Sequence, residues 1–130
     1  MGATEGEMTM ISPETQTFRL LSKTAHLLNS VSEAAWTNGI PSPARWDLHR
    51  VGTDAYLAQR HILDALGRGA VPAERLPVAD ITAVLEEAAR SLAAIPLEFR
   101  NVDTERLEQR VSSLARRALA LTPSSTRAGP

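Results

Sequence analysis

Apolar side chains recur every three or four positions along four stretches of the sequence, at about 13–36, 43–67, 77–95 and 103–122. This spacing is the period of an amphipathic α-helix. The last two stretches carry the most regular pattern, with single apolar positions alternately four and three residues apart: Ile81, Leu85, Ala88, Leu92, Ile95, and Leu107, Val111, Leu114, Ala118, Leu121. The pattern therefore predicts four helices, each with one face to bury.

Residues that start and stop helices stand between these stretches. Ser12-Pro13 and Ser42-Pro43 each place a capping hydroxyl before a proline, which is a typical helix start. Asp103 is a candidate cap for the last helix. The breaking residues lie where the apolar pattern lapses, at Asn38-Gly39, Gly67, Pro72, Pro77, Pro96 and Pro123.

These elements predict an all-α fold, because no stretch alternates apolar and polar residues with the β-branched enrichment of a strand. Four amphipathic helices with short links favour an antiparallel four-helix bundle over residues 12–122. The polar ends, residues 1–11 and 123–130, are expected to be a flexible arm and a disordered tail.

Composition narrows the chemistry. The chain has 130 residues, a formal charge of −1 and no cysteine, which excludes disulfides, cysteine-bound metals and thiol catalysis. Thirteen arginines against one lysine, with twenty alanines, indicate a GC-rich bacterial genome. The acidic N-terminus lacks a secretory signal, and no apolar run is long enough to span a membrane, so we expect a cytoplasmic protein. No cofactor or metal is predicted.

The second stretch is apolar on two sides. Leu48, Val51, Ala55 and Ile62 define its core side, whereas Trp46 and Leu57 fall on the opposite side. Trp and Arg are common anchors of protein interfaces, so we predict a partner-binding surface that comprises Trp46, Arg50, Leu57, Arg60 and His61. The alternative is that the N-terminal arm or the loop 38–43 covers Trp46. A close crossing with another helix would explain Gly52 within this helix, and so would chance.

The fourth helix offers a basic stripe. Arg106, Arg110 and Arg117 share one flank and could contact phosphates of a nucleic acid. Glu105 and Glu108 lie beside them, so the competing interpretation is an ordinary solvated helix face.

Two short motifs suggest an enzyme. Arg45-x-x-x-His49 resembles the Arg-x(4–6)-His signature of HEPN domains, with three intervening residues instead of four to six, and implies a helical ribonuclease. The run Ala25-His26-Leu27-Leu28-Asn29-Ser30 resembles the histidine phosphotransfer motif A-H-x-L-K-G, with Asn29 and Ser30 in place of Lys and Gly. That resemblance implies a phosphoryl-accepting His26.

Taken together, the residues predict a non-enzymatic helical module for protein–protein interaction or oligomerisation, such as a homodimer or an adaptor. A nucleic-acid-associated regulator and a small helical enzyme remain as alternatives.

Overall fold

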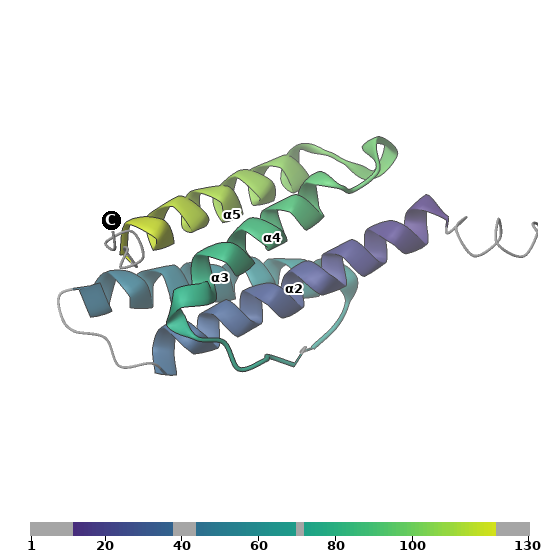
Figure 1. The fold of residues 1–130 in the computed structure, drawn as a ribbon. Helices are drawn as coiled ribbons and strands as arrows, with labels where there is room; N and C mark the ends of the chain where they lie inside the picture. Colours follow the sequence, from purple (N-terminus) through teal and green to yellow (C-terminus); the bar gives the residue numbers. More distant parts are fainter. Residues whose placement is uncertain (1–11, 38–43, 70–71, 122–130) are drawn as a thin grey trace, which may run out of the picture.

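The computed structural model of the chain describes residues 12–37, 44–69 and 72–121. Within these ranges it contains four α-helices and two short 3₁₀ turns, with no strand. Figure 1 shows them in chain order: α2 (Pro13–Thr37), α3 (Ala44–Leu66), η1 (Val78–Asp80), α4 (Ile81–Ala93), η2 (Leu97–Phe99) and α5 (Val102–Leu121). Four predicted features lie outside the described residues: the arm 1–11, the tail 123–130, the helix-breaking pair Asn38-Gly39 and the helix start Ser42-Pro43.

Two helix ends follow the sequence signals closely. Ser12 caps α2, since its Oγ accepts a hydrogen bond from the backbone N–H of Thr15 at 3.1 Å. Gly67 ends α3 in the left-handed region with a φ of 71°. The N–H groups of Gly67 and Arg68 donate to the carbonyls of Asp64 and Leu63, the two bonds of a Schellman motif.

The third helix is shorter than the predicted range 77–95. Pro77 is extended, with φ −66° and ψ 147°, and the 3₁₀ turn η1 precedes α4, which begins at Ile81. At the other end α4 stops at Ala93. Proline disfavours the helical conformation in the residue before it, so Pro96 limits the helix at its C-terminal end. At the other end the residues after Pro77 form the 3₁₀ turn η1 instead of the first turn of the α-helix.

The prediction that Asp103 caps the last helix was wrong. Asn101 is the cap: its Oδ1 accepts hydrogen bonds from the backbone N–H of Thr104 at 2.9 Å and from the Thr104 hydroxyl at 3.1 Å. The 3₁₀ turn η2 delivers the chain to α5 two residues earlier than the apolar pattern indicates, so Asp103 lies inside the first turn.

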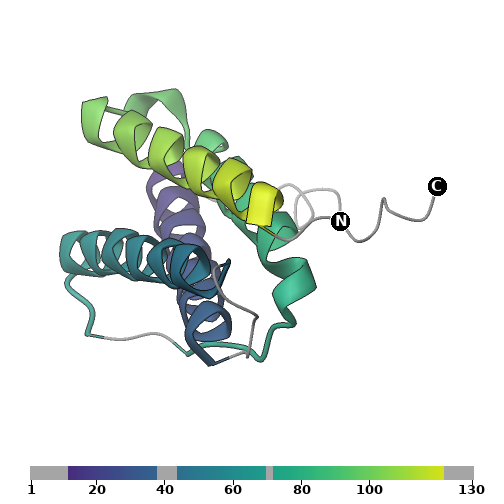
Figure 2. The same ribbon diagram turned by 90° about the vertical axis from the view of Figure 1, so that its left-hand side faces the viewer.

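The four helices pack as a ring, which confirms the predicted bundle. α2 packs against α3 and α4, and α5 packs against the same two helices from the other side. Figure 2 shows that the helix axes cross at visible angles rather than lying strictly parallel. Contacts in opposite sequence order give relative directions: His61 meets Asp103 and Asp54 meets Arg117, so α3 and α5 run oppositely.

The predicted apolar faces form one core. Of the apolar positions quoted above for the last two helices, all are buried except Leu121, which packs partly buried against the others. The sequence pattern missed Leu63, which is fully buried beside Ile62. Among the described residues, no helix combines the length and the apolar character needed to cross a membrane.

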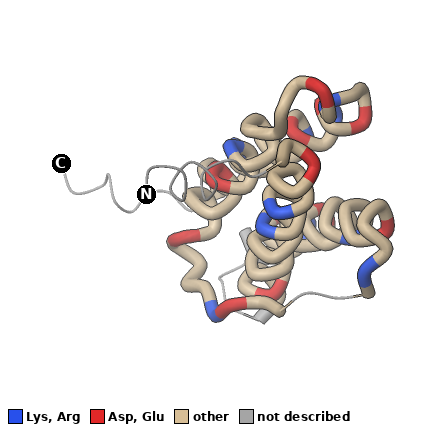
Figure 3. Tube along the Cα trace, turned by 90° about the vertical axis from the view of Figure 1, so that its right-hand side faces the viewer, with Lys and Arg blue, Asp and Glu red and all other residues tan. Residues whose placement is uncertain are grey.

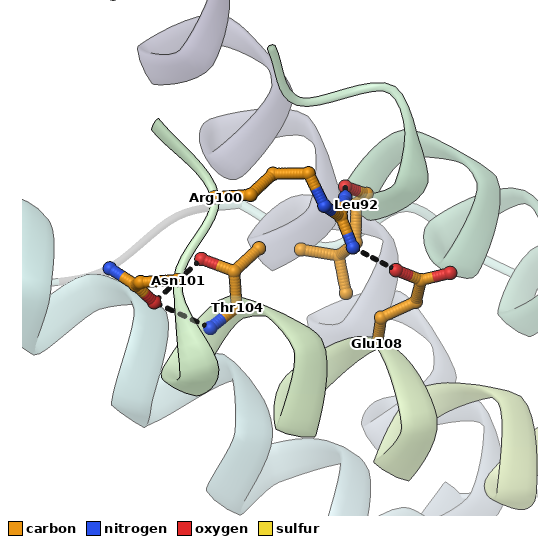
Figure 4. A network of polar contacts seen from close by, with 5 residues as sticks. All are labelled: Leu92, Arg100, Asn101, Thr104 and Glu108. Atoms are coloured by element: carbon orange, nitrogen blue, oxygen red, sulfur yellow. Dashed lines mark hydrogen bonds and ion pairs between the residues drawn. The ribbon is translucent and has the colours of Figure 1, made fainter. Parts of the chain in front are cut away.

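A network around Arg100 fastens α4 to α5 (Figure 4). One guanidinium nitrogen donates to the carbonyl of Leu92 at 2.7 Å, in the last turn of α4, and another pairs with the Glu108 carboxylate of α5. Both side chains are mostly buried, with 14% of Arg100 and 30% of Glu108 exposed. The Leu92 carbonyl also accepts from the backbone N–H of Ile95 at 3.2 Å, so Arg100 adds a charge-assisted hydrogen bond to it at the helix end.

The loop before η1 is tied to α2 by two polar side chains. Nδ1 of His26 donates to the carbonyl of Pro72 at 2.8 Å, and Oγ of Ser30 accepts from the backbone N–H of Glu74 at 2.8 Å. Nε2 of His26 lies 3.9 Å from the Glu74 carboxylate. The two residues of the phosphotransfer-like motif are thus bound to the protein's own backbone.

Candidate interaction surface

The outward side of α3 carries a line of exposed residues that includes Trp46 and Leu57. Trp46, Arg50, Leu57 and Asp64 lie within about 40° of one another around the helix axis, with Thr53 and His61 at the borders. All six are exposed, Trp46 at 68% and Leu57 at 49%. We call these six residues the α3 face. It contains four residues of the predicted surface: Trp46, Arg50 and Leu57 in one line, and His61 at the border.

An aromatic cluster stands at the start of this face. His49 stacks on Trp36 at the end of α2, with ring centroids 4.2 Å apart and planes inclined by 16°. Trp46 packs edge-on against His49, with ring centroids 5.9 Å apart and planes inclined by 82°. Stacked and T-shaped pairs are the favoured arrangements of such rings. Trp36 remains 52% exposed, so both indoles are held in place and still open to solvent.

The cluster borders a shallow hollow of about 380 Å³. It combines aromatic faces with a carboxylate, a guanidinium and a hydroxyl, and its lining comprises Trp36, Trp46, Asp47, His49, Arg50 and Thr53. Apolar walls with a few polar groups of both signs suit a protein side chain.

Gly52 explains how the cluster forms. A Cβ at this position would lie 2.8 Å from the Cβ of Ala35 and 3.1 Å from Cδ1 of Trp36. The absence of a side chain therefore lets α2 and α3 approach closely and lets the Trp36 ring lie along α3. This confirms the predicted close crossing at Gly52.

Arg60 and His61, the other two residues of the predicted surface, are engaged within the chain. Arg60 donates to the carbonyl of Gly69, beyond the end of α3, at 2.9 Å and to the carboxylate of Asp64, one turn along α3, at 3.0 Å. Nε2 of His61 lies 2.8 Å from Oδ2 of Asp103 at the start of α5. Both contacts fix the C-terminal end of α3 and so hold the face in position.

Sequence reasoning missed Trp36 as a contributor, and it left Asp64 out of the predicted surface although this residue falls on the same side of the helix as Trp46 and Leu57. Trp36 belongs to a different helix, so only the pairing of α2 with α3 reveals that it joins His49 and Trp46. Asp64 carried a usable signal, because it lies seven residues after Leu57, two helical turns along the same side.

The structure gives no contact between Arg45 and His49, the two residues of the HEPN-like motif, among the residues that it describes. His49 is half-buried between the indoles, and its Nδ1 is buried without a hydrogen-bond partner among the described residues. The side chain of Arg45 lies outside the described part of the chain.

The predicted basic stripe of α5 is divided. Arg117 pairs with Asp54 of α3 at 2.8 Å, while Arg106 and Arg110 are exposed. Figure 3 shows basic and acidic positions interspersed on the side that it presents. Among the described residues, no group of three His, Asp or Glu side chains could hold a metal ion.

Comparison with known proteins returned no relative. No protein family, no curated protein and no solved structure matches the chain.

Proposed function

We propose that this protein is a non-enzymatic helical module that binds a protein partner through the α3 face. The observation that carries the proposal is the aromatic cluster, in which Trp46 keeps 68% of its surface exposed while it packs edge-on against His49, which is itself stacked on Trp36. A large ring already held in one orientation loses little conformational freedom on binding, which favours its use as an anchor.

The neighbouring residues extend the anchor into a face. Leu57 lies three helical turns from Trp46, and Arg50 lies between them with an exposed guanidinium. Aromatic and aliphatic anchors flanked by arginine are typical of the central part of a protein interface. The contacts of Arg60 and His61 support the proposal, because they keep the far end of the face rigid.

The test is the paired substitution Trp46→Ala and Leu57→Ala. Both side chains are largely solvated, so we expect the helical circular dichroism to stay unchanged while association is lost. Each truncation at an interface anchor costs about 2 kcal/mol or more of binding free energy. Association is measured by sedimentation velocity of the purified protein and by chemical crosslinking in a lysate of the source cells.

The matched control is Leu97→Ala with Leu119→Ala, which removes two apolar side chains exposed at 86% and 54% outside the α3 face. The proposal predicts wild-type association for this control. Equal association of the wild type and the Trp46→Ala, Leu57→Ala variant would contradict the proposal.

A further inference from the structure

Charged residues of opposite sign lie at equal distances before and after Leu57 along α3. Arg50 lies seven residues before Leu57 and Asp64 lies seven residues after it. Asp54 lies three residues before and Arg60 three residues after. Positions at equal distance on the two sides of Leu57 thus carry opposite charges, in two separate pairs.

This pattern is the one required for self-recognition. In a two-fold symmetric dimer the same patch faces itself, and two antiparallel helices place position 57 + k of one copy opposite position 57 − k of the other. Opposite charges at equal distances then meet as attractive pairs, and each pair occurs twice. A partner of different sequence would require no such symmetry within this chain.

We propose that the partner of the α3 face is a second copy of this protein, bound through an antiparallel α3–α3 contact whose two-fold axis passes at Leu57. This inference rests on the function proposed above and names the partner. Arg50 of each copy pairs with Asp64 of the other, and the two Leu57 side chains meet at the centre. Thr53 lies opposite His61, where a hydroxyl and an imidazole can hydrogen-bond.

The main charge pair is available for this contact. Arg50 is exposed and has no ion-pair or hydrogen-bond partner among the described residues. The Asp64 side chain is 70% exposed, although one of its oxygens accepts from Arg60. Asp54 and Arg60 already have partners within the chain, Arg117 and Asp64, so they reinforce the register and Arg50 with Asp64 determines it.

The apolar residues supply the attraction and the charges supply the alignment. Exposed ion pairs contribute little affinity but strongly disfavour registers that bring like charges together. Leu57 occupies the centre, and the two Trp46 rings lie at the ends of the contact, each against the last turn of the partner helix. Because one pair of helices makes a small interface, we expect a weak dimer that depends on concentration.

Charge reversal and its compensation test the register. Sedimentation velocity of the full chain is measured from about 1 µM to about 1 mM, the range that covers weak association. Arg50→Asp alone and Asp64→Arg alone each place like charges opposite one another twice, and we expect each to weaken the dimer about tenfold or more. Arg50→Asp combined with Asp64→Arg restores opposite charges, and we expect association within about threefold of wild type.

Arg110→Asp is the matched control, because it makes the same charge change on the exposed surface of α5. It is expected to leave the dimer unchanged, and circular dichroism verifies that every variant is folded. A monomeric wild type over the whole range would overturn the inference, as would a double variant no better than the single ones.

These outcomes are distinguishable from failure of the proposed function. A monomeric wild type whose crosslinks in the lysate still depend on Trp46 and Leu57 rejects the second copy as partner and retains the interaction face. If neither the sedimentation of the purified protein nor the crosslinks in the lysate depend on Trp46 and Leu57, the α3 face itself is rejected as an interaction surface.

Discussion

Gly52 shows how one residue determines which helices meet. Its lack of a side chain lets Ala35 and Trp36 of α2 approach the backbone of α3, and this contact places Trp36 beside His49. The missing Cβ is thus a condition for the aromatic cluster.

Gly52→Ala is expected to destabilise the protein by about 1–2 kcal/mol, because overpacking of about 2–3 kcal/mol at the crossing outweighs the gain of about 1 kcal/mol in helix propensity. Thermal and urea unfolding measure the change. Gly69→Ala serves as control, since a Cβ there meets nothing within 4 Å. Equal stabilities of the Gly52→Ala protein and the wild type would show that the close contact is unimportant.

For single residues, the sequence predicted which side chains are exposed better than it predicted which residues they contact. Trp46 and Leu57 lie on the exposed side of α3 because their angular position opposes the core residues, and angular position follows from sequence alone. The contacts of Arg60 with Gly69, of His61 with Asp103 and of Trp36 with His49 depend on chain segments far away or beyond a helix end, so no local pattern could indicate them.

At the scale of elements, the α4–α5 pair depends on Arg100 as well as on its apolar seam. The guanidinium joins the Leu92 carbonyl to the mostly buried carboxylate of Glu108. Removing the guanidinium leaves both acceptors without this partner in a poorly hydrated place.

We therefore expect Arg100→Met, which keeps an unbranched stem, to lower the free energy of unfolding by about 2–3 kcal/mol. The measurement is urea denaturation followed by circular dichroism. Arg106→Met on the exposed side of α5 is the control, and surface changes of that kind usually stay within about 0.5 kcal/mol. A loss at Arg100 no larger than that at Arg106 would contradict the structural role of the network.

Helix positions were predictable and helix ends only partly so. The apolar period located all four helices, because burial of one face requires it. Ser12 and Gly67 acted as expected, since their signals are local. Asp103 and the start of α4 were misplaced because the short 3₁₀ turns η1 and η2 redirect the chain without an apolar signature of their own.

At the scale of the whole molecule, the sequence predicted a bundle but could not say which helices are neighbours. Regular apolar seams fit several partners equally well, so pairing is decided by close contacts such as Gly52 with Ala35 and by ion pairs such as Asp54 with Arg117. The observed ring places α3 between α2 and α5 and leaves its outward side open. That open side is the basis of the proposed function.

In the proposed dimer the outward side of α3 meets its own copy at Leu57. The chain contains no cysteine, so a Leu57→Cys variant introduces a single thiol at the proposed two-fold axis. Disulfides form when the two Cα atoms lie within about 7 Å, a separation that two helices reach only at their contact. Leu97→Cys, at a more exposed site outside the α3 face, provides the control.

Mild oxidation followed by non-reducing electrophoresis measures the crosslink. We expect a covalent dimer for Leu57→Cys that forms much faster than for Leu97→Cys and that decreases when Arg50→Asp is added. Equal crosslinking rates at the two positions, or a rate at position 57 unaffected by Arg50→Asp, would contradict the proposed dimer.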